Sequence, residues 1–196
     1  MNKEPGKWRA IVAGCVLALA ACRSSPTRIY ALDPAAPSTH IDTYQAAALH
    51  VDSVSVPGSW DRLEILSRSA AGGLQINDFD QWSAPLAQIA RQALSDDLDQ
   101  RLPPGSVVYP RLPKPPGALG INVDILEFNA DASQASMRAS WLIVPAAGPQ
   151  SARRSVALLH DSLTSTGPAG MAHAWSTLIG QLADHIAADA ASFAMP

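Results

Sequence analysis

The longest regular pattern of apolar positions in this chain runs from residue 74 to residue 102. It opens with Leu74 and Ile76, whose spacing of two predicts a short strand, and Asn77 and Asp78 then interrupt the alternation. After this break, apolar side chains recur at spacings of three and four, which predicts an amphipathic helix of about five to six turns. The predicted apolar stripe consists of Trp82, Leu86, Ile89, Ala90, Ala93, Leu94 and Leu98.

The ends of this predicted helix carry typical helix-boundary residues. Asp80 or Ser83 could accept a hydrogen bond from a free backbone N–H and so act as the N-cap. Pro85 suits the first turn, where the N–H that proline lacks has no partner. Two prolines, at 103 and 104, end the helix.

A second long helix is predicted near the end of the chain. Pro168 suits its first turn, and the residues after it repeat apolar side chains with a helical period. The stripe consists of Met171, Trp175, Leu178, Ile179, Leu182 and Ile186.

The remaining apolar segments alternate with polar residues and predict strands. The clearest hairpin pairs residues 119–125 with 135–143, and a shift of alternation near Asp52 and Ser53 predicts a β-bulge. Further strands are predicted near Ile29 and at 48–56, 63–68, 106–110 and 155–159. The order of strands, helix, strands and helix predicts an α+β fold, in which a mainly antiparallel or mixed sheet carries two long helices packed on one face.

The first 21 residues have the composition of a targeting segment. Three basic residues (Lys3, Lys7 and Arg9) precede an apolar stretch at 11–21, which has the length of a signal-peptide core and is short for a membrane span. It ends in Leu-Ala-Ala-Cys at 19–22, which resembles the lipobox of bacterial lipoproteins. An ordinary secretory signal with a chance cysteine and an uncleaved anchor helix are the alternatives.

The lipobox resemblance implies cleavage before Cys22, a diacylglycerol on its thiol and an acylated amine. The chain then divides into a signal peptide (1–21), a lipidated tether with a first edge segment (22–40) and one domain (41–196). Several acyl chains exceed what stable membrane anchoring requires. Cleavage would also remove Cys15, so the mature domain would hold no free thiol.

Composition then narrows the classes of function. The mature chain would keep 11 basic and 16 acidic residues, a net charge of −5, which disfavours nucleic-acid binding. No nucleophile elbow, phosphate loop or His-Glu-x-x-His motif is present. We therefore predict no catalytic residues, no metal site and no cofactor.

Several side chains invite a functional reading, but each has a simpler structural one. His160 and Asp161 could belong to a triad but suit a strand end at the surface, while His173 and His185 are more than three helical turns apart. The acidic residues at 96, 97 and 99 are interpreted as a solvated helix face rather than a metal site. Trp82 and Trp175 are predicted to be buried between helices and sheet rather than to line a lipid pocket.

One surface is a candidate partner interface. Trp60 lies in a predicted loop with no apolar stripe to join, and Arg62 and Arg68 follow it. Exposed Trp and Arg side chains anchor many interfaces. The alternative is that Trp60 folds back onto the edge of the sheet. The proline-rich loop at 111–117 would lose little entropy on docking.

The order of motifs along the chain resembles the ABC-type transport auxiliary lipoproteins, especially the paraquat-inducible protein C-like group. The matching features are the lipobox Cys, Tyr30-x-Leu32-Asp33, Asp61-Arg62-x-x-Ile65-x-x-Arg68, Leu74, Phe79, Trp82-x-x-Pro85-Leu86, Trp141 and the alanine-rich last helix. The resemblance implies a non-enzymatic, periplasm-facing lipoprotein of the outer membrane. It implies as partners an MCE-domain (mammalian-cell-entry) protein and a permease of an intermembrane lipid transport system, and possible assembly into a homo-oligomer.

Arg23, the residue directly after the lipidated Cys, predicts which membrane holds the lipoprotein. In the sorting rule that the resemblance implies, Asp at this position retains a lipoprotein in the inner membrane, so Arg23 predicts the outer membrane. Two other functions stay open from the sequence. The domain could enclose an acyl chain as a periplasmic lipid carrier, or it could be a periplasmic hydrolase.

Overall fold

The computed structural model describes residues 26–193 except 69–72, 132, 164 and 166. Within these residues the chain forms two long helices and eight strands, with one short 3₁₀ turn at Pro149–Ser151. The helices are α2 (Leu86–Arg101) and α3 (Pro168–Ala191). The strands are β1 (Arg28–Tyr30), β2 (Leu49–Ser55), β3 (Glu64–Arg68), β4 (Leu74–Trp82), β5 (Val107–Val108), β6 (Leu119–Ala130), β7 (Gln134–Val144) and β8 (Arg153–Ser162).

The main sheet has five strands in the order β5-β2-β6-β7-β8. β2 runs parallel to β5 and β6, whereas β6, β7 and β8 are joined antiparallel by hairpins. The predicted hairpin of β6 and β7 is confirmed, with Ile121 opposite Ile143 and Val123 opposite Trp141. The predicted bulge is also confirmed, because the register of β2 against β6 shifts between Val51 and Ser53.

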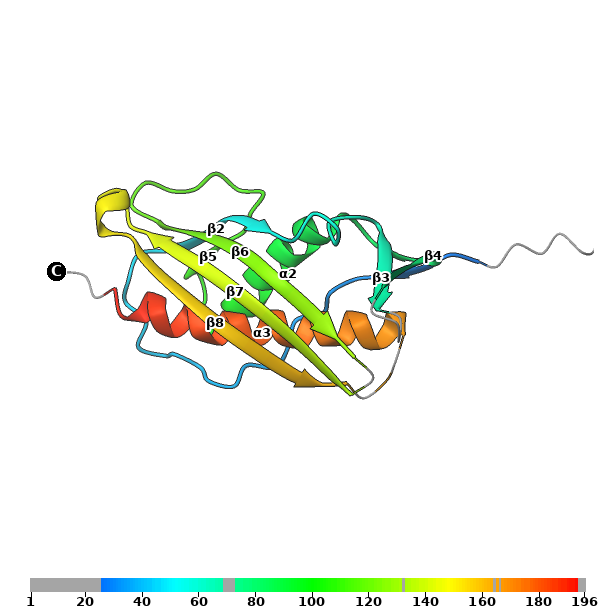
Figure 1. Ribbon diagram of the computed structural model, residues 1–196. Helices are drawn as coiled ribbons and strands as arrows, with labels where there is room; N and C mark the ends of the chain where they lie inside the picture. Colours follow the sequence, from blue (N-terminus) through cyan, green and yellow to red (C-terminus); the bar gives the residue numbers. More distant parts are fainter. Residues whose placement is uncertain (1–25, 69–72, 132, 164, 166, 194–196) are drawn as a thin grey trace, which may run out of the picture.

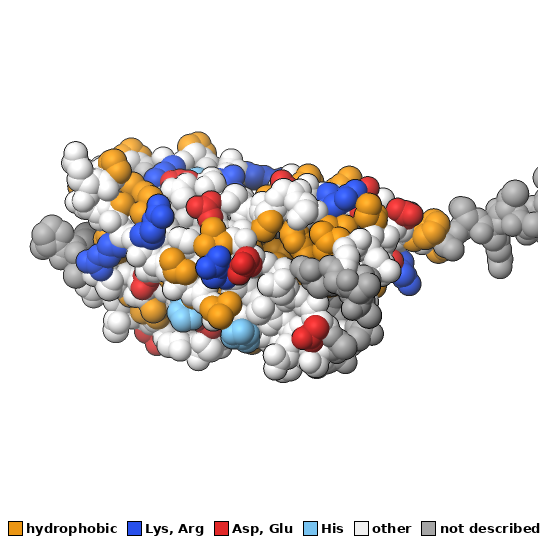
Figure 2. All heavy atoms as spheres, in the orientation of Figure 1, with side chains coloured by type: hydrophobic (Ala, Val, Ile, Leu, Met, Phe, Trp, Pro, Cys, Tyr) orange, Lys and Arg blue, Asp and Glu red, His pale blue; other side chains and the backbone are white. Residues whose placement is uncertain are grey.

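Both helices lie against one face of this sheet, with α3 running along β7 and β8 and α2 along β2 (Figure 1). The structure therefore confirms an α+β fold with a mixed sheet and two helices on one face. Neither of the two described helices covers the opposite face, which carries hydrophobic, basic and acidic side chains intermixed (Figure 2). Val156 and Leu158 of β8 are exposed there, and Arg138 pairs with Glu127 across the strands.

The core fills the space between the helices and the inner face of the sheet. Its largest fully buried side chain is Trp175 of α3, whose ring stacks on Phe128 of β6 with centroids 4.2 Å apart. Trp60 meets Phe128 edge-to-face at 5.2 Å. The rings of Trp60, Phe128 and Trp175 form an aromatic cluster that links the loop after β2 to the main sheet and to α3. The predicted burial of Trp82 and Trp175 is confirmed, with 3% and 0% of each residue exposed.

The predicted boundary between strand and helix at 77–85 is wrong. β4 does not stop at Asn77 but continues to Trp82, so Trp82 lies at the end of a strand and α2 begins only at Leu86. The reason is tertiary, because β4 is the central strand of a second sheet, ordered β1-β4-β3, and neighbours on both sides satisfy its backbone.

The predicted side-chain cap of α2 is also wrong. Pro85 occupies the N-cap position and no side chain at that position caps the helix. The backbone N–H of Ala87 instead donates to Asp61 Oδ1 at 3.1 Å, so an acceptor from a distant loop replaces the local cap. Asp80, one of the two residues predicted to cap α2, lies instead in β4 and is buried.

Candidate functional site

The described chain begins at Pro26, and Cys22, the predicted lipidation site, lies outside the described residues.

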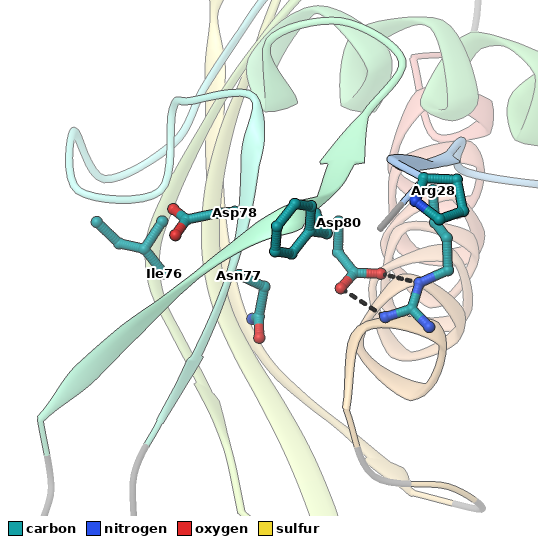
Figure 3. Close-up of a pocket in the computed structure, with 7 residues that line it drawn as sticks. Arg28, Ile76, Asn77, Asp78 and Asp80 are labelled. Atoms are coloured by element: carbon teal, nitrogen blue, oxygen red, sulfur yellow. Dashed lines mark hydrogen bonds and ion pairs between the residues drawn. The ribbon is translucent and has the colours of Figure 1, made fainter. Parts of the chain in front are cut away.

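The first strand is held firmly to the fold. Arg28 donates to both carboxylate oxygens of Asp80, from Nε at 2.6 Å and from Nη2 at 2.8 Å (Figure 3). The Tyr30 hydroxyl donates to the same carboxylate at 3.0 Å. The point where the tether meets the domain is therefore fixed by a bidentate pair, a strong and directional contact.

The contacts with Arg28 and Tyr30 determine the charge state of Asp80. Hydrogen bonds from Arg28 lower the pKa of Asp80, and the hydroxyl of Tyr30 lowers it further. The backbone register supports the same contact, since Arg28 lies opposite Asp80 in the parallel pairing of β1 and β4. Asp80 therefore stays ionised in the folded protein at neutral pH and holds β1 on β4.

A surface hollow of about 570 Å³ lies beside the contact between Arg28 and Asp80. Its lining mixes apolar side chains, among them Pro26, Ile76 and Phe79, with the charged side chains of Arg28 and Asp80. In Figure 3, Ile76 and Asp78 project to one side of β4, while the Asp80 carboxylate points toward Arg28. Residues 26–28 and the middle of β4 therefore form one local surface.

A second set of polar contacts fastens the chain after β1. We call residues 33–41 the strap, because it crosses the two helices without secondary structure. The backbone N–H of Asp33 donates to Ser176 Oγ at 3.1 Å, and that of Ala35 donates to Asp97 Oδ1 at 2.8 Å. The Ser38 hydroxyl donates to Asp184 at 2.7 Å. The strap therefore contacts both α2 and α3.

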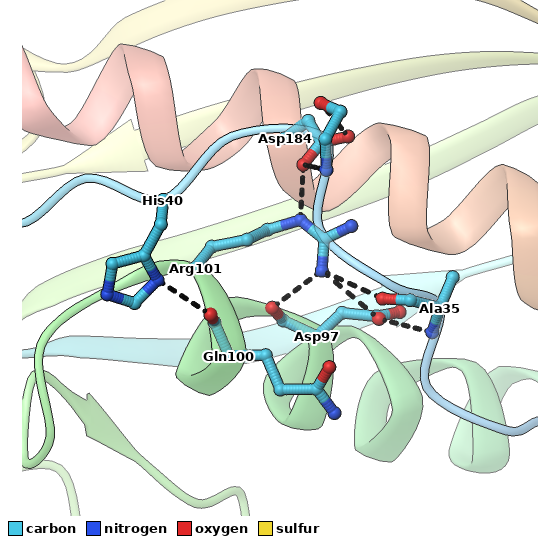
Figure 4. Close-up of polar contacts among 7 residues, drawn as sticks. Ala35, His40, Asp97, Gln100, Arg101 and Asp184 are labelled. Atoms are coloured by element: carbon cyan, nitrogen blue, oxygen red, sulfur yellow. Dashed lines mark hydrogen bonds and ion pairs between the residues drawn. The ribbon is translucent and has the colours of Figure 1, made fainter.

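Arg101 is the centre of this network (Figure 4). Its side chain is only 1% exposed and donates from Nε to Asp184 Oδ1 at 2.5 Å and from Nη1 to the Asp97 carbonyl at 2.8 Å. It also pairs with the Asp97 carboxylate at 3.3 Å. A buried guanidinium with two carboxylate partners ties α2 to α3, and removing one partner would leave an uncompensated charge.

The prediction that the acidic residues at 96, 97 and 99 form a solvated face is wrong for Asp97. Asp97 is fully buried, and burial raises its pKa to about 6 against the lowering effects of the Ala35 amide and Arg101. A sequence signal existed, since Ala90, Ala93 and Leu94 lead at spacings of three and four to Asp97 and Arg101. Opposite charges at i and i+4 on a buried stripe indicate an internal ion pair.

The candidate interface residues do not form the exposed surface that was predicted. Trp60 is only 7% exposed, because its ring packs on Phe128 and Trp175, so the alternative of a folded-back ring holds. Arg62 is partly exposed and pairs with Glu64 at 2.8 Å. Arg68 ends β3, and its side chain lies outside the described set. The role of both arginines in partner binding stays a prediction.

The proline-rich loop is exposed along residues 111–117. Lys114 nevertheless fastens it to the sheet through Asp52 at 3.0 Å, and Asp52 contacts the buried His50 at 2.6 Å. These side chains lie over Gly120, where an added Cβ would come within 2.1 Å of Asp52 Oδ2. The loop is therefore held in place beside β2 and β6.

The other candidate side chains lie as follows. His160 is exposed on β8 and Asp161 is partly buried beside it. His173 and His185 both belong to α3. In the part of the chain that the structure describes, no group of three His, Cys, Asp or Glu side chains could hold a metal ion. No helix in that part is long and apolar enough to cross a bilayer.

Comparison with known families decides what kind of protein this is. The family described as the ABC-type transport auxiliary lipoprotein component matches residues 30–187. The chain belongs to this family. The family resemblance seen in the sequence is thereby confirmed, and so are a role beside a transport system and the lipoprotein class with its membrane association.

Two solved structures support the same fold for this auxiliary lipoprotein. A Xanthomonas campestris protein of the DUF330 family is 16% identical with a TM-score of 0.64, covering 82% of this chain and 93% of its own. An uncharacterised protein is 17% identical with a TM-score of 0.63, covering 84% of this chain and 99% of its own. A comparison with curated proteins gave no match. At these identities the likeness concerns the fold alone.

Proposed function

We propose that this chain is an outer-membrane lipoprotein whose domain faces the periplasm and serves as a non-catalytic auxiliary of an MCE-type intermembrane lipid transport system. The observation that carries the proposal is the family match over residues 30–187, preceded by Leu-Ala-Ala-Cys at 19–22. Cys22 provides the anchor, and Arg23 after it favours the outer membrane. The partners are the MCE-domain protein and its permease.

The described surfaces fit a docking role. The sheet face opposite the helices is uncovered, and Val156 and Leu158 are exposed on it at 60% and 59%. The loop at 111–117 is exposed and fixed through Lys114. Preorganised surfaces lose little conformational entropy on binding. Arg62, with its side chain partly exposed next to the aromatic cluster, is a further candidate contact.

Fractionation of cell envelopes tests whether the protein resides in the outer or the inner membrane. Wild-type protein should be acylated by mass and should separate with outer-membrane markers, whereas Arg23→Asp should move the same acylated protein to the inner membrane. Cys22→Ala should remain uncleaved and without lipid. Wild-type protein found with inner-membrane markers contradicts the proposed address.

Native mass spectrometry of the domain separates a docking role from the alternative of a lipid carrier. A carrier has to enclose a large part of its ligand in an apolar cavity, whereas the lining of the hollow beside β1 includes the charged side chains of Arg28, Asp78 and Asp80. The proposal predicts protein without stoichiometric bound lipid after purification from the periplasm. A one-to-one lipid adduct would favour the carrier.

A further inference from the structure

The start of the domain and an exposed apolar part of β4 lie at the same place. Pro26, the first described residue, lines one hollow together with Ile76 and Phe79. The bidentate contact of Arg28 with Asp80 fixes this arrangement, since it holds β1 parallel against β4. The position of Pro26 relative to β4 is therefore set by the fold.

Three large apolar side chains of β4 are left in solvent here. Leu74 is 43% exposed, Ile76 51% and Phe79 49%. We call these three residues the β4 rim. β4 lies at the end of the molecule where the described chain begins (Figure 1), and Ile76 and Phe79 line the same hollow as Pro26 there. Exposed apolar groups that cluster in this way mark contact sites.

The length of the tether decides what the β4 rim meets. Cys22 precedes Pro26 by four residues, and a fully extended chain gains about 3.5 Å per residue, so Pro26 lies within about 14 Å of the anchor. The headgroup and interfacial layer of one leaflet is about 5–8 Å thick, so even this maximum reach ends less than about 10 Å beyond that layer. A lipidated Cys22 therefore places the hollow, and the rim beside it, at the membrane surface.

We propose that the β4 rim contacts the lipid leaflet that holds the acyl chains of Cys22, with Phe79 and Ile76 entering the headgroup and upper acyl region. This inference rests on the lipid anchor of the proposed function. Apolar side chains at an interface reach about 5–10 Å into the boundary between headgroups and acyl chains. The contact adds a second attachment to the anchor and fixes the orientation of the domain on the membrane.

The polar groups beside the β4 rim are compatible with a headgroup layer. The Arg28 side chain is 64% exposed although it pairs with Asp80, so its outer face is free to meet lipid phosphates. Asp78 is exposed at the hollow and would repel anionic lipids, whereas the carboxylate of Asp80, which also lines the hollow, is buried and paired with Arg28. The proposal therefore relies on apolar contact, with Arg28 contributing at the polar boundary.

The mature chain suits a labelling test, because Cys22 would be its only cysteine and the acyl group would block it. Phe79→Cys gives a single free thiol for an environment-sensitive fluorophore. Leu112→Cys is the matched control, since Leu112 is an apolar residue 57% exposed in the proline-rich loop. The full acylated protein is placed in vesicles of phosphatidylethanolamine and phosphatidylglycerol that contain nitroxide-labelled lipid. Ile76→Cys is a second test position, and equal unfolding transitions show that each variant folds.

The proposal predicts that nitroxide lipid quenches the label at positions 79 and 76 several-fold more strongly than at position 112. A water-soluble quencher should instead act more strongly on the label at position 112 than on the labels at 79 and 76. Equal quenching at 79 and 112 in acylated protein overturns the membrane contact and leaves the proposed function standing. Protein that carries no acyl group by mass overturns both. A label at 79 that is open to water in vesicles but shielded in native envelopes assigns the rim to a partner protein and also overturns the proposal.

Discussion

The buried carboxylate of Asp97 makes a prediction about the pH dependence of stability. Its pKa rises from 3.8 to about 6 in the folded protein because burial disfavours the charged form. The folded state therefore holds this proton more tightly than the unfolded state, so the contribution to stability is complete below pH 3.8 and is lost as pH rises through 6. The loss is about 3 kcal/mol, at 1.36 kcal/mol for each pH unit between the two pKa values.

The assay compares urea unfolding of the wild-type domain with Asp97→Asn at several pH values from 4 to 8. Asn keeps an oxygen that can accept from the Ala35 amide but does not titrate in this range. The free energy of unfolding of wild type, minus that of Asp97→Asn, should fall by about 2.4 kcal/mol between pH 4 and pH 8, because part of the full loss of about 3 kcal/mol has already occurred at pH 4. Asp78→Asn, which removes one exposed charge outside the Arg101 network, is measured alongside as the matched control.

A constant difference for Asp97→Asn would refute this reasoning. It would mean that Arg101, which contacts Asp97 at 3.3 Å, offsets the burial of the carboxylate completely. A difference that rises with pH would mean that the ion pair lowers the pKa of Asp97 below its ordinary value. The second result would identify the Arg101 network as a net source of stability, whereas the first would mean that the ion pair and the burial penalty cancel.

Three further changes test other parts of the fold. Trp175→Ala should cost about 3–5 kcal/mol in urea unfolding, because the ring is fully buried and stacks in the aromatic cluster. Gly180→Ala should cost about 1–3 kcal/mol, since the added Cβ would lie 2.5 Å from the Ala35 Cβ and push the strap off α3. Asp80→Ala should cost about 1–3 kcal/mol and speed proteolysis of the residues before β3, because the guanidinium of Arg28 and the Tyr30 hydroxyl lose their acceptor.

Periodicity predicted most of the layer structure because its signals are local. The stripe around Trp175 and the alternation of residues 119–143 each determine their own element, so α3 and the β6–β7 hairpin follow directly from the sequence. The end of β4 does not, because Asn77 pairs with β3 and residues 80–82 pair with β1, and these contacts keep the segment in a strand. That pairing depends on chain segments far away in the sequence.

The candidate site was predictable to a smaller extent. Trp60 looked like a loop residue without partners, since its contacts, Phe128 and Trp175, are distant in sequence. The pairing of Arg28 with Asp80 spans 52 residues and has no local signature. In contrast, the Leu-Ala-Ala-Cys sequence at 19–22 is a local signal, so the prediction of an anchor at Cys22 needs no structure.

Capture of partners from native envelopes tests the central claim most directly. Full-length acylated protein with a C-terminal affinity tag is isolated from detergent-solubilised envelopes after mild cross-linking, and the copurifying proteins are quantified by mass spectrometry. The account predicts strong enrichment of an MCE-domain protein, and of its permease, over a tagged and acylated outer-membrane lipoprotein of unrelated fold. Recovery of acylated protein at the outer membrane with no transport component above that control would contradict it.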